Sequence, residues 1–138
     1  MDLLAADPAT DTVILQLPAS SAYLSVLRTA TAGLAARAQF TLDEIEDLRI
    51  AVDEACAMLL ARELDAGEAP APGDDLTCQF VLGETEIQVF VSVPAGNRAL
   101  PSRDTFAWQV LSALAGDVEA STKDDRLCIA LTKKRAGL

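Results

Sequence analysis

Five segments of the chain have the apolar and polar pattern that is typical of β-strands. The first is a short apolar run at residues 13–17, which stops at Pro18. The other four alternate apolar and polar side chains, and they are 76–82, 87–93, 118–122 and 127–131. Gly83-Glu84-Thr85 is expected to join the first two of these as a hairpin, and residues 123–125 to join the last two.

Two longer segments repeat apolar residues at the spacing of an α-helix. The first helix is predicted to begin at Ser20 or Ser21 and to end near residue 38. Its predicted buried face consists of Tyr23, Leu27, Ala30 and Leu34. The second helix is predicted to begin at the capping box Thr41–Glu44 and to end near Asp65. Its predicted buried face consists of Leu42, Ile45, Leu48, Val52, Ala55 and Leu59.

A third, shorter helix is predicted from about residue 105 to residue 115, with Asp104 or Ser102 as its cap and Gly116 as its end. Its predicted buried residues are Phe106, Val110, Leu111 and Leu114. The order of elements is then β-α-α-β-β-α-β-β. We therefore expect an α+β fold, a two-layer α/β sandwich in which three helices cover one face of a mostly antiparallel sheet.

The length of the chain fits a single domain. It has 138 residues, of which 51% are hydrophobic, and a chain of this size buries a sufficient core without a metal or disulfide. We expect a flexible N-terminus at 1–11, one domain at 12–134 and a C-terminal tail at 135–138. No apolar run approaches the roughly 18 residues of a membrane span, and the first residues lack the basic start of a signal peptide. A cytoplasmic protein is expected.

The charge narrows the range of partners. Eleven Lys and Arg face 21 Asp and Glu, which gives a net charge of −10. Phosphate backbones and anionic membranes repel such a chain, so we expect no nucleic-acid and no membrane partner. A protein with a basic surface is the favoured partner, because its charge is complementary to that of the chain. The sequence has no His, so His-based catalysis and His metal sites are excluded, and no metal site is predicted.

The three Cys residues form no CxxC pair and do not indicate a disulfide framework. Cys56 lies near the buried stripe of the second helix, and Cys78 lies on an apolar strand face. Both are therefore expected in the core. Cys128 alternates away from its apolar neighbours, so it is the thiol that we expect to be most exposed.

Three stretches carry a family resemblance. They are Leu15–Ala19 with the helix that contains Arg28, the run LRIAVDEAC at 48–56, and the run FAWQVLSALAGDV at 106–118. Together they resemble the anti-sigma factor and serine-protein kinase family of the Bergerat-fold (GHKL) ATPases, and the last run is most similar to the actinobacterial (mycobacterial) anti-sigma-F branch. The resemblance extends from about residue 13 to residue 134. It implies the Bergerat fold and a role in transcription regulation of the kind that sporulation and general-stress anti-sigma factors perform.

The family's catalytic N box is only partly present. In the family a Glu orients or deprotonates the attacking group, and an Asn four residues later holds Mg²⁺ through its side-chain oxygen. Glu54 matches the Glu, but Met58 stands at the Asn position, and a thioether is a poor ligand for a hard cation. The resemblance implies a vestigial catalytic role for Glu54. The residues themselves favour an ordinary solvated carboxylate on an acidic arc with Asp43, Asp47 and Asp53.

The other nucleotide determinants of the family are missing. In the family an Asp side chain recognises the amino group of adenine, whereas residues 93–97 here contain no acid. The family's Gly-rich phosphate loop would fall at residues 102–108, which contain no Gly. Phe106 and Trp108 are expected to be core residues, and their bulk could fill a nucleotide cavity. No cofactor is therefore predicted, and ATP with Mg²⁺ is expected only if the chain is a kinase.

Arg28 matches a partner-binding residue of the family. The family uses an Arg on its first helix to contact the sigma factor and the anti-anti-sigma antagonist, and an Arg suits bidentate bonds to a carboxylate. Alternatively, Arg28 pairs with a neighbouring acid such as Glu46 or Asp47.

These observations leave three functions open. The first is an anti-sigma factor that sequesters an alternative sigma factor and is released by an anti-anti-sigma protein. The second is an ATP-dependent kinase that phosphorylates a Ser on that antagonist. The third is a scaffold domain of the same fold with an unrelated protein partner. Retention of Arg28 with degraded nucleotide motifs favours the first. Relatives pair through the first helix and the strand before it, so the resemblance also implies a homodimer.

Overall fold

The computed structural model describes residues 10–60, 74–96 and 100–136 and shows an α+β sandwich of two layers. The sheet has five antiparallel strands in the order β1-β2-β3-β5-β4. The strands are β1 (Asp11–Pro18), β2 (Asp75–Leu82), β3 (Glu86–Pro94), β4 (Asp117–Lys123) and β5 (Arg126–Lys134). The helices are α1 (Leu24–Arg37), α2 (Leu42–Leu60) and α4 (Phe106–Leu114), and a 3₁₀ turn, η2 (Ser21–Tyr23), precedes α1. The predicted fold class and order of elements are confirmed.

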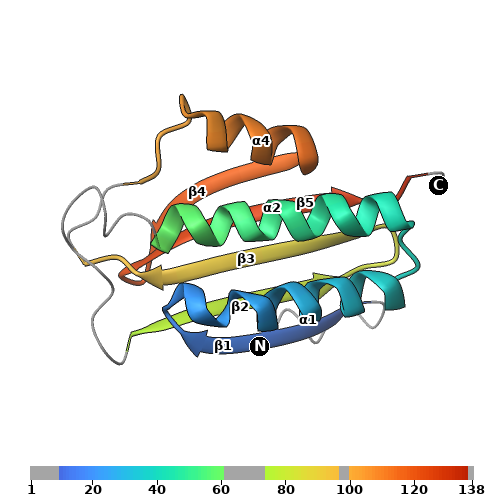
Figure 1. The fold of residues 1–138 in the computed structure, drawn as a ribbon, viewed down its shortest axis with the longest axis horizontal. Coiled ribbons are helices and arrows are strands. Elements are labelled where there is room, and N and C mark those ends of the chain that lie inside the picture. The colour runs from blue at the N-terminus through green and yellow to red at the C-terminus, as the bar shows by residue number, and fades with distance from the viewer. Residues whose placement is uncertain (1–9, 61–73, 97–99, 137–138) are drawn as a thin grey trace.

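All three helices lie on one face of the sheet, and α2 lies between α1 and α4 (Figure 1). The inward side chains of β2, β3 and β5 alternate with half-buried residues on the opposite face, as the pattern predicts. The core between the two layers contains Leu27 and Leu48 from the helices and Phe80, Val89 and Ile129 from the sheet. The opposite face of the sheet, which no described helix covers, is called the open face below.

The capping box at the start of α2 is formed as predicted. The backbone N–H of Glu44 donates to Thr41 Oγ1 at 3.2 Å, and the backbone N–H of Thr41 donates to Glu44 Oε1 at 2.7 Å. Glu44 is buried, and its second carboxylate oxygen accepts a hydrogen bond from the backbone N–H of Ala136. These backbone donors, that of Thr41 above all, hold the pKa of Glu44 below its ordinary value although burial opposes them.

Two positions at helix starts differ from the prediction. Leu42 and Phe106 were expected to be buried, but they are 84% and 81% exposed. Each is the first residue of its helix, where the side chain lies beyond the part of the helix that packs on the sheet. The cap of α4 is Thr105, not Asp104 or Ser102, because Thr105 Oγ1 accepts a hydrogen bond from the Trp108 backbone N–H at 3.1 Å.

The buried face of the first helix also differs from the prediction. Ser20 caps the η2 turn, as expected, but the α-helical spacing begins only at Leu24. Tyr23 is therefore exposed, and the buried residues are Leu24, Leu27, Thr31 and Ala35. Thr31 is tolerated in the core because its hydroxyl donates to the Leu27 carbonyl at 2.8 Å.

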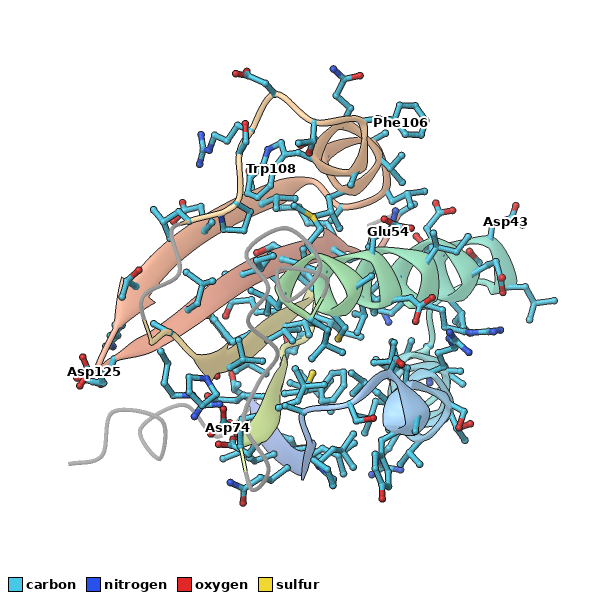
Figure 2. All side chains as sticks on the ribbon, turned by 60° about the vertical axis from the view of Figure 1, so that its left-hand side comes forward. Asp43, Glu54, Asp74, Phe106, Trp108 and Asp125 are labelled. Carbon is cyan, nitrogen blue, oxygen red and sulfur yellow. The ribbon has the colours of Figure 1, made fainter. Side chains whose placement is uncertain are left out.

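The β4–β5 hairpin turns at two residues, Asp124 and Asp125, which both adopt positive φ angles of 53° and 62°. This left-handed pair matches the twist of a two-residue hairpin, and Asp tolerates the conformation better than most residues. Figure 2 shows Asp125 at the tip of this hairpin. The expected end of α2 near Asp65 lies outside the described residues. Within the residues that the structure describes, no helix combines the length and apolar character that crossing a bilayer requires.

Candidate functional site

Arg28 is held at the surface by Asp53, which lies on the neighbouring helix. Arg28 Nε donates to Asp53 Oδ1 at 2.9 Å, and Nη2 donates to Oδ2 at 3.2 Å, which makes the pair bidentate. The Arg28 side chain remains 44% exposed. The carboxylate thus binds one edge of the guanidinium, while nearly half of the Arg28 side chain stays exposed to solvent.

The surroundings of Arg28 combine charge with exposed apolar area. Arg28 and Asp53 line a small surface depression together with Arg49 and Ile50 of α2. Ile50 is one of the large apolar side chains that remain exposed, and Arg49 is paired with Glu46 at 3.1 Å. Among charged residues, Arg is the one that is enriched at protein–protein interfaces.

The alternative expectation was that Arg28 pairs with a neighbouring acid such as Glu46 or Asp47. It does pair with an acid of α2, but that acid is Asp53. Glu46 pairs with Arg49, and Asp47 pairs with Lys133 of β5 at 3.4 Å. The acids of α2 do not form one arc, because Asp53 is six residues after Asp47 and points to another side of the helix. Asp53 faces α1, whereas Asp47 faces β5.

Glu54 lies on a different side of α2 from Asp53, the residue that pairs with Arg28. Figure 2 shows Glu54 and Asp43 on the side of α2 that faces α4. Glu54 is half-buried, and Met58, four residues later, packs against the hydrophobic core. Residues four apart on a helix share a face, so Met58 occupies the position beside Glu54 where a Mg²⁺ ligand would be required. An apolar thioether packed on the core does not supply that oxygen.

The start of α4 also lacks features that would hold phosphate groups. Trp108 is buried in the core, as predicted, whereas Phe106 points away from the domain (Figure 2). Arg103 stacks on Trp108, with 5.3 Å between the guanidinium carbon and the ring centroid. Thr105 already caps the helix through the Trp108 backbone N–H. Since Met58 offers no oxygen for Mg²⁺ beside Glu54, we derive no phosphoryl-transfer step from the described residues.

No group of three or more His, Cys, Asp or Glu residues that could hold a metal ion occurs within 10–60, 74–96 and 100–136. Burial raises the pKa of the Cys56 thiol to about 12, and burial likewise raises the pKa of Cys78. Both are core residues, as expected. Cys128 is only half-buried, on the open face, and burial raises its pKa as well.

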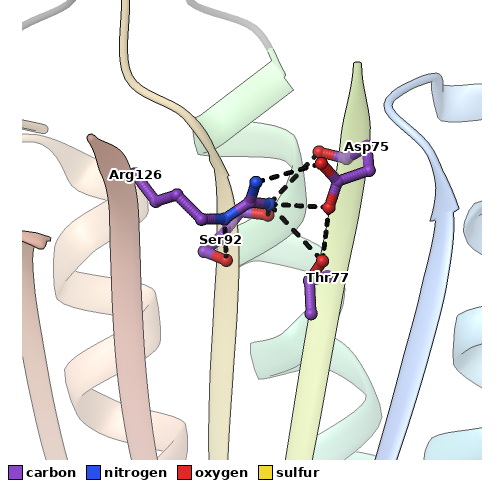
Figure 3. Close-up of polar contacts among 4 residues, drawn as sticks. All are labelled: Asp75, Thr77, Ser92 and Arg126. Carbon is purple, nitrogen blue, oxygen red and sulfur yellow. Dashed lines mark hydrogen bonds and ion pairs between the residues drawn. The ribbon is translucent and has the colours of Figure 1, made fainter. Parts of the chain in front are cut away.

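One polar cluster on the open face was not predicted. Arg126 of β5 reaches across β3 to β2, as Figure 3 shows. Its Nη1 and Nη2 donate to Asp75 Oδ1 and Oδ2 at 3.0 and 2.8 Å, and its Nε donates to Ser92 Oγ at 2.9 Å. Thr77 also donates its hydroxyl hydrogen to Asp75. Burial would raise the pKa of Asp75, but hydrogen bonds from Arg126, Thr77 and Gln16 outweigh burial and lower it.

The described residues form an antiparallel five-stranded sheet that three helices cover on one face, and a known structure has the same fold. A solved structure of the RsbU and RsbW domains of Rv1364c from Mycobacterium tuberculosis matches this fold with a TM-score of 0.66. The match covers 91% of this chain and 32% of that chain at 15% sequence identity. At such identity the similarity concerns the fold alone.

Sequence comparison points to the same group. The chain is 35% identical over 82 residues to the serine-protein kinase RsbW of Listeria monocytogenes, which is 59% of this chain and 50% of that protein. It is 34% identical over 80 residues to the serine-protein kinase RsbW of Bacillus cereus, which is 56% of this chain and 46% of that protein. No protein-family model matches the chain. The chain thus resembles the RsbW serine-protein kinases, as predicted, and spans about half the length of the curated relatives it matches.

Proposed function

We propose that the chain is an anti-sigma regulatory domain that binds an alternative sigma factor and is released by an anti-anti-sigma protein. The observation that carries the proposal is the geometry of Arg28. Its side chain is oriented by Asp53 at the surface, at the position where the resembling family places its partner-binding Arg. The bound chain would cover the surface of the sigma factor and so keep the sigma factor from RNA polymerase.

The charges of the chain favour a partner with a basic surface that also carries a carboxylate to bind Arg28. The net charge of −10 attracts basic protein surfaces over a distance of about a Debye length. Arg28 adds a specific requirement, because the exposed part of its guanidinium suits a carboxylate on the partner. The exposed apolar residue Ile50 of α2, which lines the same depression as Arg28, would supply apolar contact area beside this anchor.

The test is biolayer interferometry of the purified chain against the alternative sigma factors of the source organism. The informative variant is Arg28→Glu, which should weaken binding by about 2–5 kcal/mol if the partner carboxylate is buried in the complex. The matched control is Arg37→Glu, which makes the same charge change on an exposed residue of the same helix. Absence of binding to every sigma factor would refute the proposal.

The alternative function is that of an ATP-dependent serine kinase acting on the antagonist. Its support is the name of the relatives and the presence of Glu54 on the flank of α2 that faces α4. We favour the binding role because Met58 packs against the core where a Mg²⁺ ligand would be required. Labelled phosphate transferred from ATP to an anti-anti-sigma protein would decide for the kinase.

We further propose that the chain acts as a homodimer in the cytoplasm.

A further inference from the structure

The strand β4 forms one edge of the sheet, and among the described residues its outer side has no backbone partner. It lies at the end of the strand order and pairs only with β5. The β4–β5 hairpin turns at Asp124 and Asp125 and closes on the pair Lys123–Arg126. The hydrogen bond of such a turn joins the two closing residues, and bonded pairs then alternate with non-bonded pairs along the ladder. The odd-numbered residues of β4 therefore bond to β5, and the even-numbered residues direct their N–H and C=O groups outward.

The ladder between β3 and β5 gives the same result independently. Ala95 donates its backbone N–H to the Asp125 carbonyl at 2.8 Å and so continues the β3–β5 register. The odd-numbered residues of β5 thus bond to β3, and its even-numbered residues bond to the odd-numbered residues of β4. The backbone groups that face outward from β4 are consequently those of Val118, Ala120 and Thr122.

The two faces of β4 differ in chemistry. Val118 and Ala120 are half-buried and pack against the core, on the side of the sheet where α4 lies beside β4 (Figure 1). Side chains alternate along a strand, so Asp117 and Glu119 lie on the open face. Both acids are exposed, and neither forms an ion pair within the described ranges of the chain. A strand added at this edge therefore meets half-buried apolar side chains on one face and carboxylates on the other.

We propose that β4 binds an extended, basic segment of a partner protein, which adds to the sheet as a sixth, antiparallel strand. Antiparallel pairing continues the pattern of the sheet and is the more stable kind per residue. Basic side chains of the segment would lie opposite Asp117 and Glu119, and opposite charges across two strands stabilise their pairing. The net charge of −10 favours such a segment over a second copy of the chain, which would be repelled. The surface is at the opposite edge of the sheet from β1, so the proposal does not depend on Arg28 or on a sigma factor.

The experiment uses the full chain labelled with ¹⁵N and a synthetic peptide with blocked ends, TVTVKVK. In antiparallel register this peptide places Val opposite each outward-facing residue of β4 and Lys opposite Glu119 and Asp117. One comparison peptide, TVTVEVE, reverses the charge, and another, KVKVTVT, reverses the chain direction at the same composition. Amide hydrogen exchange and NMR titration with peptide up to millimolar concentration measure the contact and its affinity.

We expect saturating TVTVKVK to slow amide exchange at Val118, Ala120 and Thr122 by roughly fivefold or more, because their N–H groups gain a partner. Exchange at Glu119 and Ser121, whose N–H groups already bond to β5, should stay unchanged. TVTVKVK should bind about fivefold or more tightly than TVTVEVE, because two cross-strand pairs change from attraction to repulsion.

Two variants test the charge contact. Glu119→Lys should remove most of the preference for TVTVKVK, whereas Glu84→Lys, the same change on an exposed residue of the β2–β3 turn, should keep it. Equal affinity of the unmodified chain for TVTVKVK and TVTVEVE would overturn the proposal, as would tighter binding of KVKVTVT or no slowing of exchange in β4 at millimolar peptide. Slow exchange at the outward amides that needs no peptide and is lost on dilution would also overturn it, because a second copy would then cover β4.

Discussion

Arg28 of α1 and Asp53 of α2 form a bidentate ion pair across the seam between two helices, with Nε–Oδ1 at 2.9 Å and Nη2–Oδ2 at 3.2 Å. Both side chains remain partly exposed, so the pair is accessible to a partner. Its main effect is to restrict the guanidinium to one orientation, which lowers the entropy that an incoming carboxylate would otherwise have to remove.

The first prediction distinguishes the effect of Asp53 on the orientation of Arg28 from its effect on the stability of the fold. Asp53→Ala should change the free energy of unfolding by less than about 1 kcal/mol, because the ion pair is exposed. It should nevertheless weaken sigma-factor binding, because Arg28 loses its fixed orientation. Urea unfolding and interferometry on the same preparation measure the two effects. Asp47→Ala, which removes the Lys133 pair on the side of α2 that faces β5, is the control and should leave binding unchanged.

The second prediction concerns pH. The folded-state pKa values of Asp75 and Glu44 are lower than their ordinary values, so both groups stabilise the fold above their ordinary pKa. This stabilisation should be lost as the pH falls below about 4 and toward the lower folded-state pKa values. Thermal unfolding from pH 7 to pH 2 measures the slope. Asp75→Asn should make the slope shallower, and an unchanged slope would contradict the assignment to Asp75.

The third prediction concerns the Asp75–Arg126 pair itself. Arg126→Met leaves the half-buried Asp75 carboxylate without its bidentate donor, and it should destabilise the fold by about 1–3 kcal/mol. Arg126→Lys keeps the charge but loses the planar fork, so its effect should be intermediate. Guanidinium unfolding curves for the two variants give the order. Equal stability of Arg126→Met and the unmodified chain would show that the cluster contributes nothing.

The fourth prediction concerns nucleotide. Isothermal calorimetry with Mg-ATP should show no micromolar binding, since Met58 supplies no Mg²⁺ ligand and residues 93–97 supply no acid for the adenine amino group. The unpaired amino group alone would cost about 1–3 kcal/mol. Met58→Asn should not restore binding, because it replaces one of several missing groups. Micromolar affinity in the unmodified chain would instead favour the kinase function.

The fifth prediction is a homodimer. Light scattering at micromolar concentration should give about twice the chain mass of 14.5 kDa. A two-fold interface of the standard kind buries roughly 1,200–2,000 Å² in total, and β1 with α1 offers exposed Ile14 and Val26 for it. Ile14→Asp, on the exposed edge strand, should shift the mass toward that of a monomer. A monomer mass across the concentration range would contradict the prediction.

The fold was predictable because its signals are local. The alternation in β2, β3 and β5 and the Thr41–Glu44 capping box each act within a few residues, and the structure confirms them. The errors at Leu42 and Phe106 occur at first helical positions, where periodicity does not show whether the helix end reaches the layer beneath it. Tyr23 was placed wrongly because a 3₁₀ turn shifts the helical spacing.

The polar contacts of the site were less predictable, because they join residues far apart in the sequence. Arg28 and Asp53 are 25 positions apart, and Arg126 and Asp75 are 51 positions apart. Helical spacing shows which acids of α2 share a side, but it does not show which side meets α1. Only the packing of α1 against α2 selects Asp53 over Glu46 and Asp47.

The most direct test of the proposed function is the affinity of one sigma factor for three forms of the chain: unmodified, Arg28→Glu and Arg37→Glu. The account predicts tight binding for the unmodified form and the Arg37 variant, and a loss of about 30-fold or more for the Arg28 variant, which is about 2 kcal/mol. Equal affinity of all three forms would contradict the role of Arg28, and binding to no sigma factor would contradict the proposed function.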